Sequence, residues 1–308
     1  MNNMKKYILP LMLLLGLKGI AQQEVMISQY MFNGLLINPA YSGSHPYWST
    51  SVLHRSQWVK MDGAPKVQTV CADGSILKGL MGVGVTFTND NIGLTTTQDL
   101  GLNASTRVSL GSGYLRMGLR LGVSRYSARL NEAIIREDSD PVYANNIKGD
   151  VIPRVGAGLY YYTNKWYLGL SAPNILSVDD KISYTNTGVN SFYRTHLYAN
   201  GGVVLTPNSE FAIKPSFLVK IQDGTGPQVD LNCNLLFMKK FWVGAGYRSQ
   251  DAIVAMLEWN ITPEMRLGYA FDYTLSDLAK YSNNSHEVML GYDFGSEVVM
   301  KTRSPRYF

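Results

Sequence analysis

Apolar and polar residues alternate one by one along most of the chain from residue 79 onward. In residues 114–127, for example, every second position from Leu115 to Val123 is apolar, and the positions between them are arginine or glycine. Successive side chains of a strand point to opposite faces, so this period of two predicts strands with one apolar and one polar face. Fourteen such strands are expected, at residues 47–59, 66–76, 79–88, 95–110, 114–127, 152–163, 165–172, 193–206, 210–222, 227–238, 240–249, 252–261, 263–274 and 285–294.

The connections between these strands differ in length. Short turns such as 111–113 and Asn164 alternate with mostly longer loops, of which 128–151 and 173–192 are the longest. Outer-membrane barrels show this asymmetry, with short periplasmic turns and long extracellular loops. Most of the expected strands have 9–16 residues. A tilted membrane strand needs about 9–11 residues, whereas strands of soluble sheets have about 5–6.

Charged residues avoid the apolar faces of these strands. Phe211, Phe217 and Ile221 lie on one apolar stripe, whereas Lys214 and Lys220 lie on the opposite face of the same segment. A basic side chain that faces lipid at mid-bilayer costs about 2–4 kcal/mol, which explains the separation. The sequence therefore predicts an all-β fold, an antiparallel transmembrane β-barrel of about 14 strands.

The N-terminus has the features of an export signal. Lys5 and Lys6 precede an apolar stretch, residues 7–17, and small residues follow at Gly19 and Ala21. This pattern predicts a signal peptide at residues 1–21 that is cleaved after Ala21. The apolar stretch is too short for a retained membrane helix, which needs about 20 residues.

Composition supports the same class of protein. Charged residues make up 17% of the chain, below the roughly 25% of soluble proteins. Cleavage would remove three of the 28 basic side chains and none of the 23 acidic ones, so the formal net charge falls from +5 to +2. So small a charge gives no reason to expect nucleic-acid binding.

Four parts of the chain are expected. They are the signal peptide (1–21), an N-terminal segment that is either a lumen plug or periplasmic (22–46), the outer-membrane β-barrel (47–294) and a periplasmic C-terminal tail (295–308). Charged positions on the inward faces carry both signs, which favours paired networks across a partly filled lumen over a wide anion pore. The alternative is that these charged residues simply face water in the lumen. The inward charges are Arg107, Arg116, Arg120, Arg154, Lys214, Lys220, Arg248, Arg266, Asp99, Asp230, Glu258, Asp272, Glu287 and Asp293.

No catalytic, metal-binding or cofactor-binding residues are expected. The four histidines lack metal-ligand spacing. Ser285, His286 and Glu287 are consecutive, so on a strand they point to alternating faces and cannot together form a Ser-His-acid triad. Cys71 and Cys233 are expected to be unpaired, although an exported protein also permits a disulfide. We therefore expect no enzyme and no cofactor.

Several short motifs follow one another in a specific order. The segment before the first expected strand contains Ser28-Gln29-Tyr30-Met31-Phe32-Asn33 and Asn38-Pro39-Ala40-Tyr41-Ser42-Gly43. Further motifs are Arg55-Ser56-Gln57-Trp58, Asn91-Ile92-Gly93, Asp230-Leu231-Asn232, Trp242-Val243-Gly244, Leu267-Gly268-Tyr269 and Ser285-His286-Glu287. Together they resemble the PorP/SprF family of outer-membrane proteins of the Bacteroidetes type IX secretion and gliding-motility machinery. Asn33-Gly34 departs from the family's usual Asn-Pro, and we expect only a local change there.

The resemblance implies a non-enzymatic outer-membrane component of type IX secretion that binds or anchors a secreted surface protein with a C-terminal sorting domain. It also implies contact with periplasmic components of the machinery, in addition to outer-membrane lipid. The alternative is a porin or a FadL-like channel for hydrophobic solutes. The expected partner-binding residues lie in the long loops and the C-terminal tail: Tyr143, Asn145, Tyr184, Lys301, Arg303 and Arg306.

Overall fold

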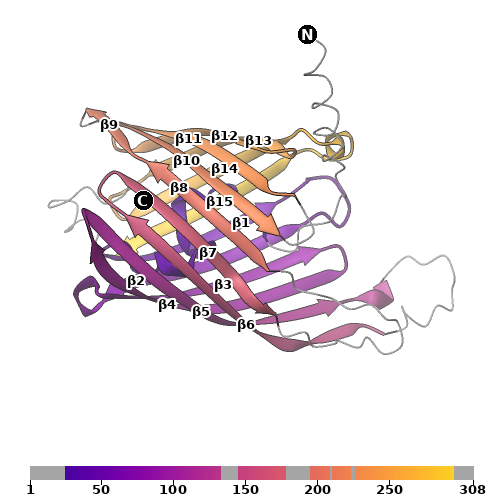
Figure 1. Ribbon diagram of the computed structural model, residues 1–308. Coiled ribbons are helices and arrows are strands. Elements are labelled where there is room, and N and C mark those ends of the chain that lie inside the picture. The colour runs from indigo at the N-terminus through magenta and orange to yellow at the C-terminus, as the bar shows by residue number, and fades with distance from the viewer. Residues whose placement is uncertain (1–24, 133–144, 178–194, 209, 223–225, 295–308) are drawn as a thin grey trace, which may run out of the picture.

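The computed structural model describes residues 25–132, 145–177, 195–208, 210–222 and 226–294. They form one closed antiparallel sheet, and Figure 1 shows its strands wrapping around a barrel. The strands are β1 (Trp48–Ser56), β2 (Lys66–Ile76), β3 (Met81–Ile92), β4 (Thr95–Leu110), β5 (Gly113–Ala128), β6 (Ile147–Tyr162), β7 (Trp166–Ser177), β8 (His196–Val203), β9 (Leu205–Asn208), β10 (Phe211–Gln222), β11 (Gln228–Phe237), β12 (Phe241–Arg248), β13 (Ala252–Asn260), β14 (Met265–Thr274) and β15 (Ser285–Phe294).

The barrel wall has fourteen strand positions, as predicted, and we call each position a stave. Strands β8 and β9 both pair with β10, so together they form one stave that is interrupted at Val204. The first and last strands close the ring, with Trp48 opposite Phe294. Each of the fourteen staves is paired on both sides, with β9 as a short extension that pairs with β10 alone, so the described sheet closes on itself as a sheet that lies in lipid must.

Three strands are longer than the alternation predicted. Strand β3 continues through Ile92, β6 begins at Ile147 rather than at 152, and β7 ends at Ser177. The predicted loop 89–94 is therefore mostly strand, since Asn89 and Asn91 pair with Gln98 and Thr96 across a tight hairpin. We call this end of the barrel the loop end, and we call the opposite end, which carries the turns at 111–112 and 163–165, the turn end.

Side chains sort by face along each strand. On β5, Leu119 and Leu121 point outward and are 63% and 64% exposed, whereas Arg116 and Arg120 point inward and are buried. An apolar outer face around a polar interior is the arrangement of a transmembrane barrel. Among the described residues, no helix is long and apolar enough to cross a membrane.

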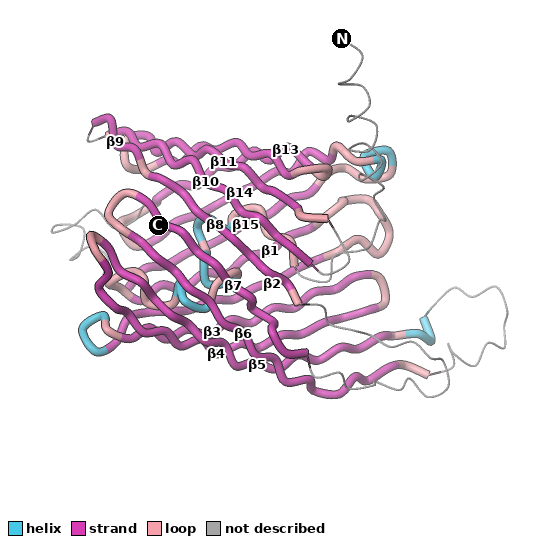
Figure 2. Tube along the Cα trace, viewed as in Figure 1, coloured by secondary structure: helices cyan, strands magenta, loops and turns pink. Residues whose placement is uncertain are grey.

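Residues 25–47, which we call the lumen segment, lie inside the barrel. They contain three short 3-10 helices, η1 (Tyr30–Phe32), η2 (Gly34–Leu36) and η3 (Pro39–Tyr41); Figure 2 shows the helical parts as short cyan pieces among the strands. The remaining 3-10 helices lie in connections: η4 (Leu77–Gly79), η5 (Leu130–Glu132) and η6 (Asp277–Lys280). Tyr30, Leu35 and Ala40 are buried against the barrel wall. The proposed signal peptide and C-terminal tail lie outside the described residues.

Candidate functional site

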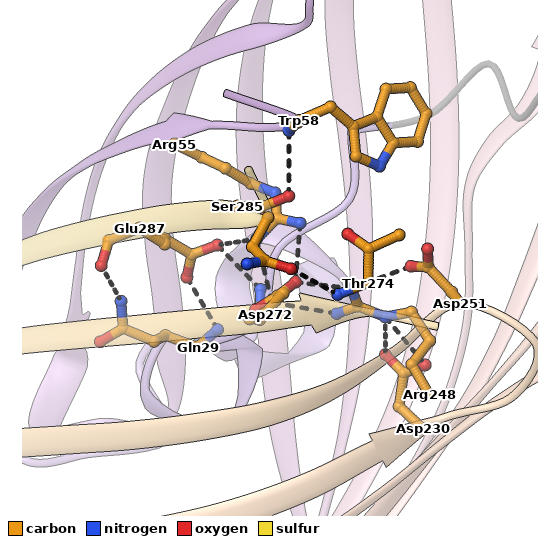
Figure 3. Close-up of polar contacts among 12 residues, drawn as sticks. Gln29, Arg55, Trp58, Asp230, Arg248, Asp251, Asp272, Thr274, Ser285 and Glu287 are labelled. Atoms are coloured by element: carbon orange, nitrogen blue, oxygen red, sulfur yellow. Dashed lines mark hydrogen bonds and ion pairs between the residues drawn. The ribbon is translucent and has the colours of Figure 1, made fainter. Parts of the chain in front are cut away.

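Buried charges from four strands meet inside the barrel at its loop end. Arg55 of β1 lies between two carboxylates, with Nη2 2.8 Å from Asp272 Oδ2 and Nη1 3.2 Å from Glu287 Oε2. Arg248 of β12 binds the same oxygen of Asp272 through Nη1, at 2.9 Å. All four side chains are at most 3% exposed, and Figure 3 shows how they converge.

Arg248 extends this cluster toward β10 and β11. Its Nε is 3.3 Å from both carboxylate oxygens of Asp230, and Nζ of Lys220 is 3.1 Å from Asp230 Oδ2. Asp251 adds a contact of 3.4 Å to Arg248 Nη1. The cluster contains three basic and four acidic side chains. We call it the loop-end network, made up of Arg55, Lys220, Asp230, Arg248, Asp251, Asp272 and Glu287.

The lumen segment is bound directly to the loop-end network. The backbone N–H groups of Ser28 and Gln29 donate to the two carboxylate oxygens of Glu287, at 2.9 and 2.8 Å. The Ser28 hydroxyl donates to Asp272 and accepts from Arg55 Nη1 at 3.0 Å. Hydrogen bonds to charged groups contribute about 1.5–3 kcal/mol each. These contacts therefore hold the N-terminal end of the segment firmly at the loop end.

A second group of contacts holds the other end of the segment near the turn end. The backbone N–H of Gly43 donates to Asp73 Oδ2 at 2.8 Å, and Nε2 of His45 lies 3.3 Å from the same oxygen. Burial alone would lower the pKa of His45, but the Asp73 carboxylate and the contact with the Tyr47 carbonyl raise it above its ordinary value. The protonated form of His45, which pairs with Asp73, is therefore stabilised relative to that of a free imidazole.

Between its ends, the segment contacts the wall on several sides. Lys214 Nζ donates to the Met31 carbonyl at 3.2 Å, and the Ser171 hydroxyl donates to the Ile37 carbonyl at 2.5 Å. The Asn232 amide donates to the Tyr30 hydroxyl at 2.7 Å. The segment is thus fixed along its length, from the loop end to the turn end.

Glycines in the wall make room for the Asn38–Gly43 motif. A Cβ at Gly118 would lie 2.3 Å from the backbone nitrogen of Ala40, and a Cβ at Gly158 would lie 2.1 Å from Asn38 Oδ1. Asn38 itself donates to the carbonyl of Leu159, at 3.0 Å. The motif therefore packs directly on backbone, which explains why glycines face inward at these two positions.

The predicted pairing of inward charges is confirmed elsewhere in the lumen as well. Asp99 of β4 binds both Arg120 and Arg154, and Arg266 Nη1 lies 2.6 Å from Asp293. Taking a charge out of water is costly unless it is paired, so these contacts offset the cost of burying the inward charges.

The predicted partner-binding residues do not gather into a described site. Asn145 is exposed just before β6. The other five, Tyr143, Tyr184, Lys301, Arg303 and Arg306, lie outside the described residues. The sequence analysis missed the role of Ser28 and Gln29, although both belong to the opening motif. The available signal for their binding site was an acidic residue near the end of several strands.

The geometry argues against the reactive arrangements considered from the sequence. Ser285 and Glu287 point inward, whereas His286 lies on the outer face, where its Nδ1 is 2.7 Å from the Tyr269 hydroxyl. These three residues therefore form no triad. Within the described part of the chain, no cluster of His, Cys, Asp and Glu is arranged to hold a metal ion. Cys71 is buried, Cys233 is exposed on the outer face, and both are free.

Solved structures with a similar outline are outer-membrane proteins of low sequence identity. They include the Acinetobacter baumannii outer membrane protein Omp33 (TM-score 0.46, 12% identity, 80% of this chain and 99% of that chain). The KdgM porin in complex with disordered oligogalacturonate has a TM-score of 0.36 at 8% identity, with coverage of 80% and 99%. Escherichia coli outer membrane phospholipase A also has a TM-score of 0.36, at 14% identity and with coverage of 83% and 93%.

No curated protein matches the sequence significantly. A family model does, however: the one described as type IX secretion system membrane protein PorP/SprF matches residues 19–292. This match spans the described barrel and the lumen segment almost completely. The chain therefore belongs to the PorP/SprF family of type IX secretion membrane proteins and is a β-barrel of the outer membrane.

Proposed function

We propose that this barrel is a non-enzymatic component of type IX secretion or gliding machinery that binds or anchors a secreted surface protein with a C-terminal sorting domain. The single observation that carries the proposal is the lumen segment, which is bound at the loop end by Asp272 and Glu287 and near the turn end by Asp73. A barrel whose interior is filled and fixed in this way is suited to holding a partner rather than to passing solute.

Two cavities beside the described part of the lumen segment are small. A cavity of about 50 Å³ lies near Asp73 and Arg266, and another of about 70 Å³ lies near Asp99 and Lys220. Each has room for a few water molecules only. The two cavities lie against different parts of the lumen segment. This supports a lumen that is closed to solutes larger than water.

The long strands at the loop end support a partner-binding surface outside the membrane. Strands β4, β5 and β6 have 16 residues each, twice the length of β12. About 9–11 residues suffice to cross the bilayer, so these three strands project beyond it. We propose that this projection, with Asn145 and the loop residues Tyr143 and Tyr184, contacts the secreted protein.

The C-terminal tail is the proposed contact with periplasmic machinery. An even number of staves places Phe294, the last described residue, at the turn end, which faces the periplasm if long loops face outward. Lys301, Arg303 and Arg306 give this tail a positive charge. We propose that it binds a periplasmic component.

Deleting the gene tests the proposal. One large surface protein should disappear from the cell exterior while general permeability stays unchanged, and the intact gene should restore it. A pull-down from detergent-solubilised outer membrane should recover the same protein. If the deletion strain displays every surface protein normally and fails only to take up a solute, the proposal is wrong.

The polar inner wall favours one second candidate, a solute channel that opens when the lumen segment leaves. Ser51, Thr69, Asn103 and Ser105 are inward, buried and uncharged, and water-filled barrels have inner walls of this kind. This candidate requires a conducting state, which a planar bilayer experiment measures.

A further inference from the structure

On β1–β6, the outer face changes from apolar to polar toward the loop end. Val70, Phe87, Leu100 and Val123 are cross-strand partners in one apolar outer row. Cross-strand partners share a face, and the next two outer rows toward the loop end are polar on β1–β5; on β6 the first row ends at the exposed, apolar Val151, which is left out of the set named below, and the second ends at Lys148. They contain His54, Gln68, Asn89, Gln98 and Arg125, and then Ser56, Lys66, Asn91, Thr96, Ser127 and Lys148. We call these eleven residues the outer polar belt.

Side-chain amides in the outer polar belt bond to one another across the strands. The Asn89 amide donates to Gln68 Oε1 at 3.1 Å, and the Gln98 amide donates to Asn89 Oδ1 at 3.3 Å. Each amide NH₂ group has two hydrogens. These two hydrogen bonds use one amide hydrogen of Asn89, one of Gln98 and none of Gln68. Ordered donors therefore remain along the outer surface.

The charges of the outer polar belt have one sign. Lys66, Arg125 and Lys148 are exposed, and none of the eleven positions is acidic. Among the described residues, no carboxylate forms an ion pair with these three cations. By contrast, Arg129 just beyond the belt pairs with Glu132, at 3.1 Å. The belt therefore presents positive charge that no described carboxylate pairs with, beside ordered hydrogen-bond donors.

The belt covers only one part of the barrel circumference. On β12–β14, the outer row nearest the loop end contains Tyr247, Ile253 and Tyr273 as cross-strand partners. Aromatic residues at this level are the usual interfacial girdle. A polar, cationic surface on β1–β6 is thus a local departure from the girdle and needs its own explanation.

We propose that the outer polar belt binds the phosphorylated sugar headgroup of a glycolipid in the outer leaflet. The apolar row through Phe87 and Leu100 would contact acyl chains, and the belt directly above it would lie at headgroup level. Phosphates match the three cations, and sugar hydroxyls match the amide donors and acceptors. Lys66 and Arg125 lie three strands apart, about 14 Å across the strands, and one outer row apart along them, which suits a headgroup with two separated phosphates better than one with a single phosphate. A zwitterionic headgroup is disfavoured because its amine meets the same cations.

The proposal is tested on the purified full-length barrel in detergent, with bis-phosphorylated lipid A as the probe and native mass spectrometry as the readout. The triple variant Lys66→Gln/Arg125→Gln/Lys148→Gln should retain about tenfold less lipid A than the wild type. The matched control, Lys165→Gln/Lys239→Gln/Lys240→Gln, removes three exposed cations from the turn end and should bind as the wild type does. Heat-modifiable mobility on gels checks that each variant is folded; if the triple variant is not, Arg125→Gln alone should still weaken binding.

Two further probes identify the part of the lipid that is recognised. Dephosphorylated lipid A and phosphatidylglycerol should both bind more weakly than bis-phosphorylated lipid A. Equal retention of phosphatidylglycerol would overturn the assignment to a glycolipid. Equal losses in the belt and turn-end variants would overturn the site itself, because they would show that bulk charge alone attracts the lipid.

Discussion

Arg55 of β1 and Asp272 of β14 form an ion pair of 2.8 Å, although β15 lies between their strands. The pair therefore crosses the seam at which the first and last strands close the barrel. The Ser28 hydroxyl bonds to both side chains. Closure of the barrel and attachment of the lumen segment thus depend on the same few atoms.

Removing one partner of this pair should destabilise the barrel strongly. Asp272→Ala leaves Arg55 and Arg248 buried without a shared carboxylate, and breaking a buried pair costs about 3–5 kcal/mol. Urea unfolding in detergent, followed by tryptophan fluorescence, measures the loss. The matched control is Glu132→Ala, whose exposed pair with Arg129 is worth less than about 1 kcal/mol. Equal effects of the two changes would contradict the role of the loop-end network.

A methyl group at Gly118 should push the lumen segment away from the wall. Its Cβ would lie 2.3 Å from the Ala40 nitrogen, so residues 38–41 must move. In a background without native cysteines, a cysteine placed at the fully buried Ala40 should react faster with thiol reagents when Gly118→Ala is present. Gly226→Ala, which meets nothing within 4 Å, is the control and should leave the rate unchanged.

Raising the pH should weaken the attachment near the turn end. Burial opposes the charge on His45, but Asp73 raises its pKa above the unfolded value of about 6.5. The stabilisation is therefore complete below about pH 6.5 and is lost as the pH rises through the folded pKa. Unfolding midpoints across this range should fall for the wild type relative to His45→Gln. Parallel curves for the two proteins would show that the pair does not titrate.

Labelling on intact cells should establish the orientation. With Cys71→Ser and Cys233→Ser as background, a cysteine at the exposed loop-end position Asn145 should react with an impermeant thiol reagent. One at Asn164, exposed at the turn end, should react only after the outer membrane is opened. The reverse pattern would place the long loops in the periplasm, and the glycolipid site at the wrong leaflet.

The alternation of apolar residues predicted the barrel because lipid enforces it. Fourteen staves, their faces and the inward position of residues such as Arg116 all follow from a period of two. The period of two did not predict that strands extend further at the loop end. Asn89 and Asn91 are polar like their neighbours, so once the strand leaves the membrane no apolar face marks it, and only backbone pairing with β4 shows that it continues.

The candidate site was less accessible to sequence reasoning. That Arg248 would find carboxylates was predictable, since inward charges of both signs cannot remain unpaired in a filled lumen. Arg55 was not among the inward charges expected from the sequence. Which carboxylates the two arginines find was not predictable, because Ser28 and Asp272 are 244 positions apart and meet only when the ring closes. The plug interpretation of residues 22–46 was one of two alternatives, and the contacts of Ser28 and Asp73 favour it.

Conductance separates the anchoring function from the channel function. The intact mature chain should give little or no current in planar bilayers, because the lumen segment is bound to Glu287 at the loop end and to Asp73 near the turn end. Deleting residues 22–44 removes the contacts of Ser28 and Gly43 and exposes the polar wall, so large openings should appear. Gly226→Ala serves as a control that leaves the segment in place and should stay silent. Steady porin-like currents from the intact chain would show that the segment does not close the lumen, and the anchoring proposal would lose the observation on which it rests.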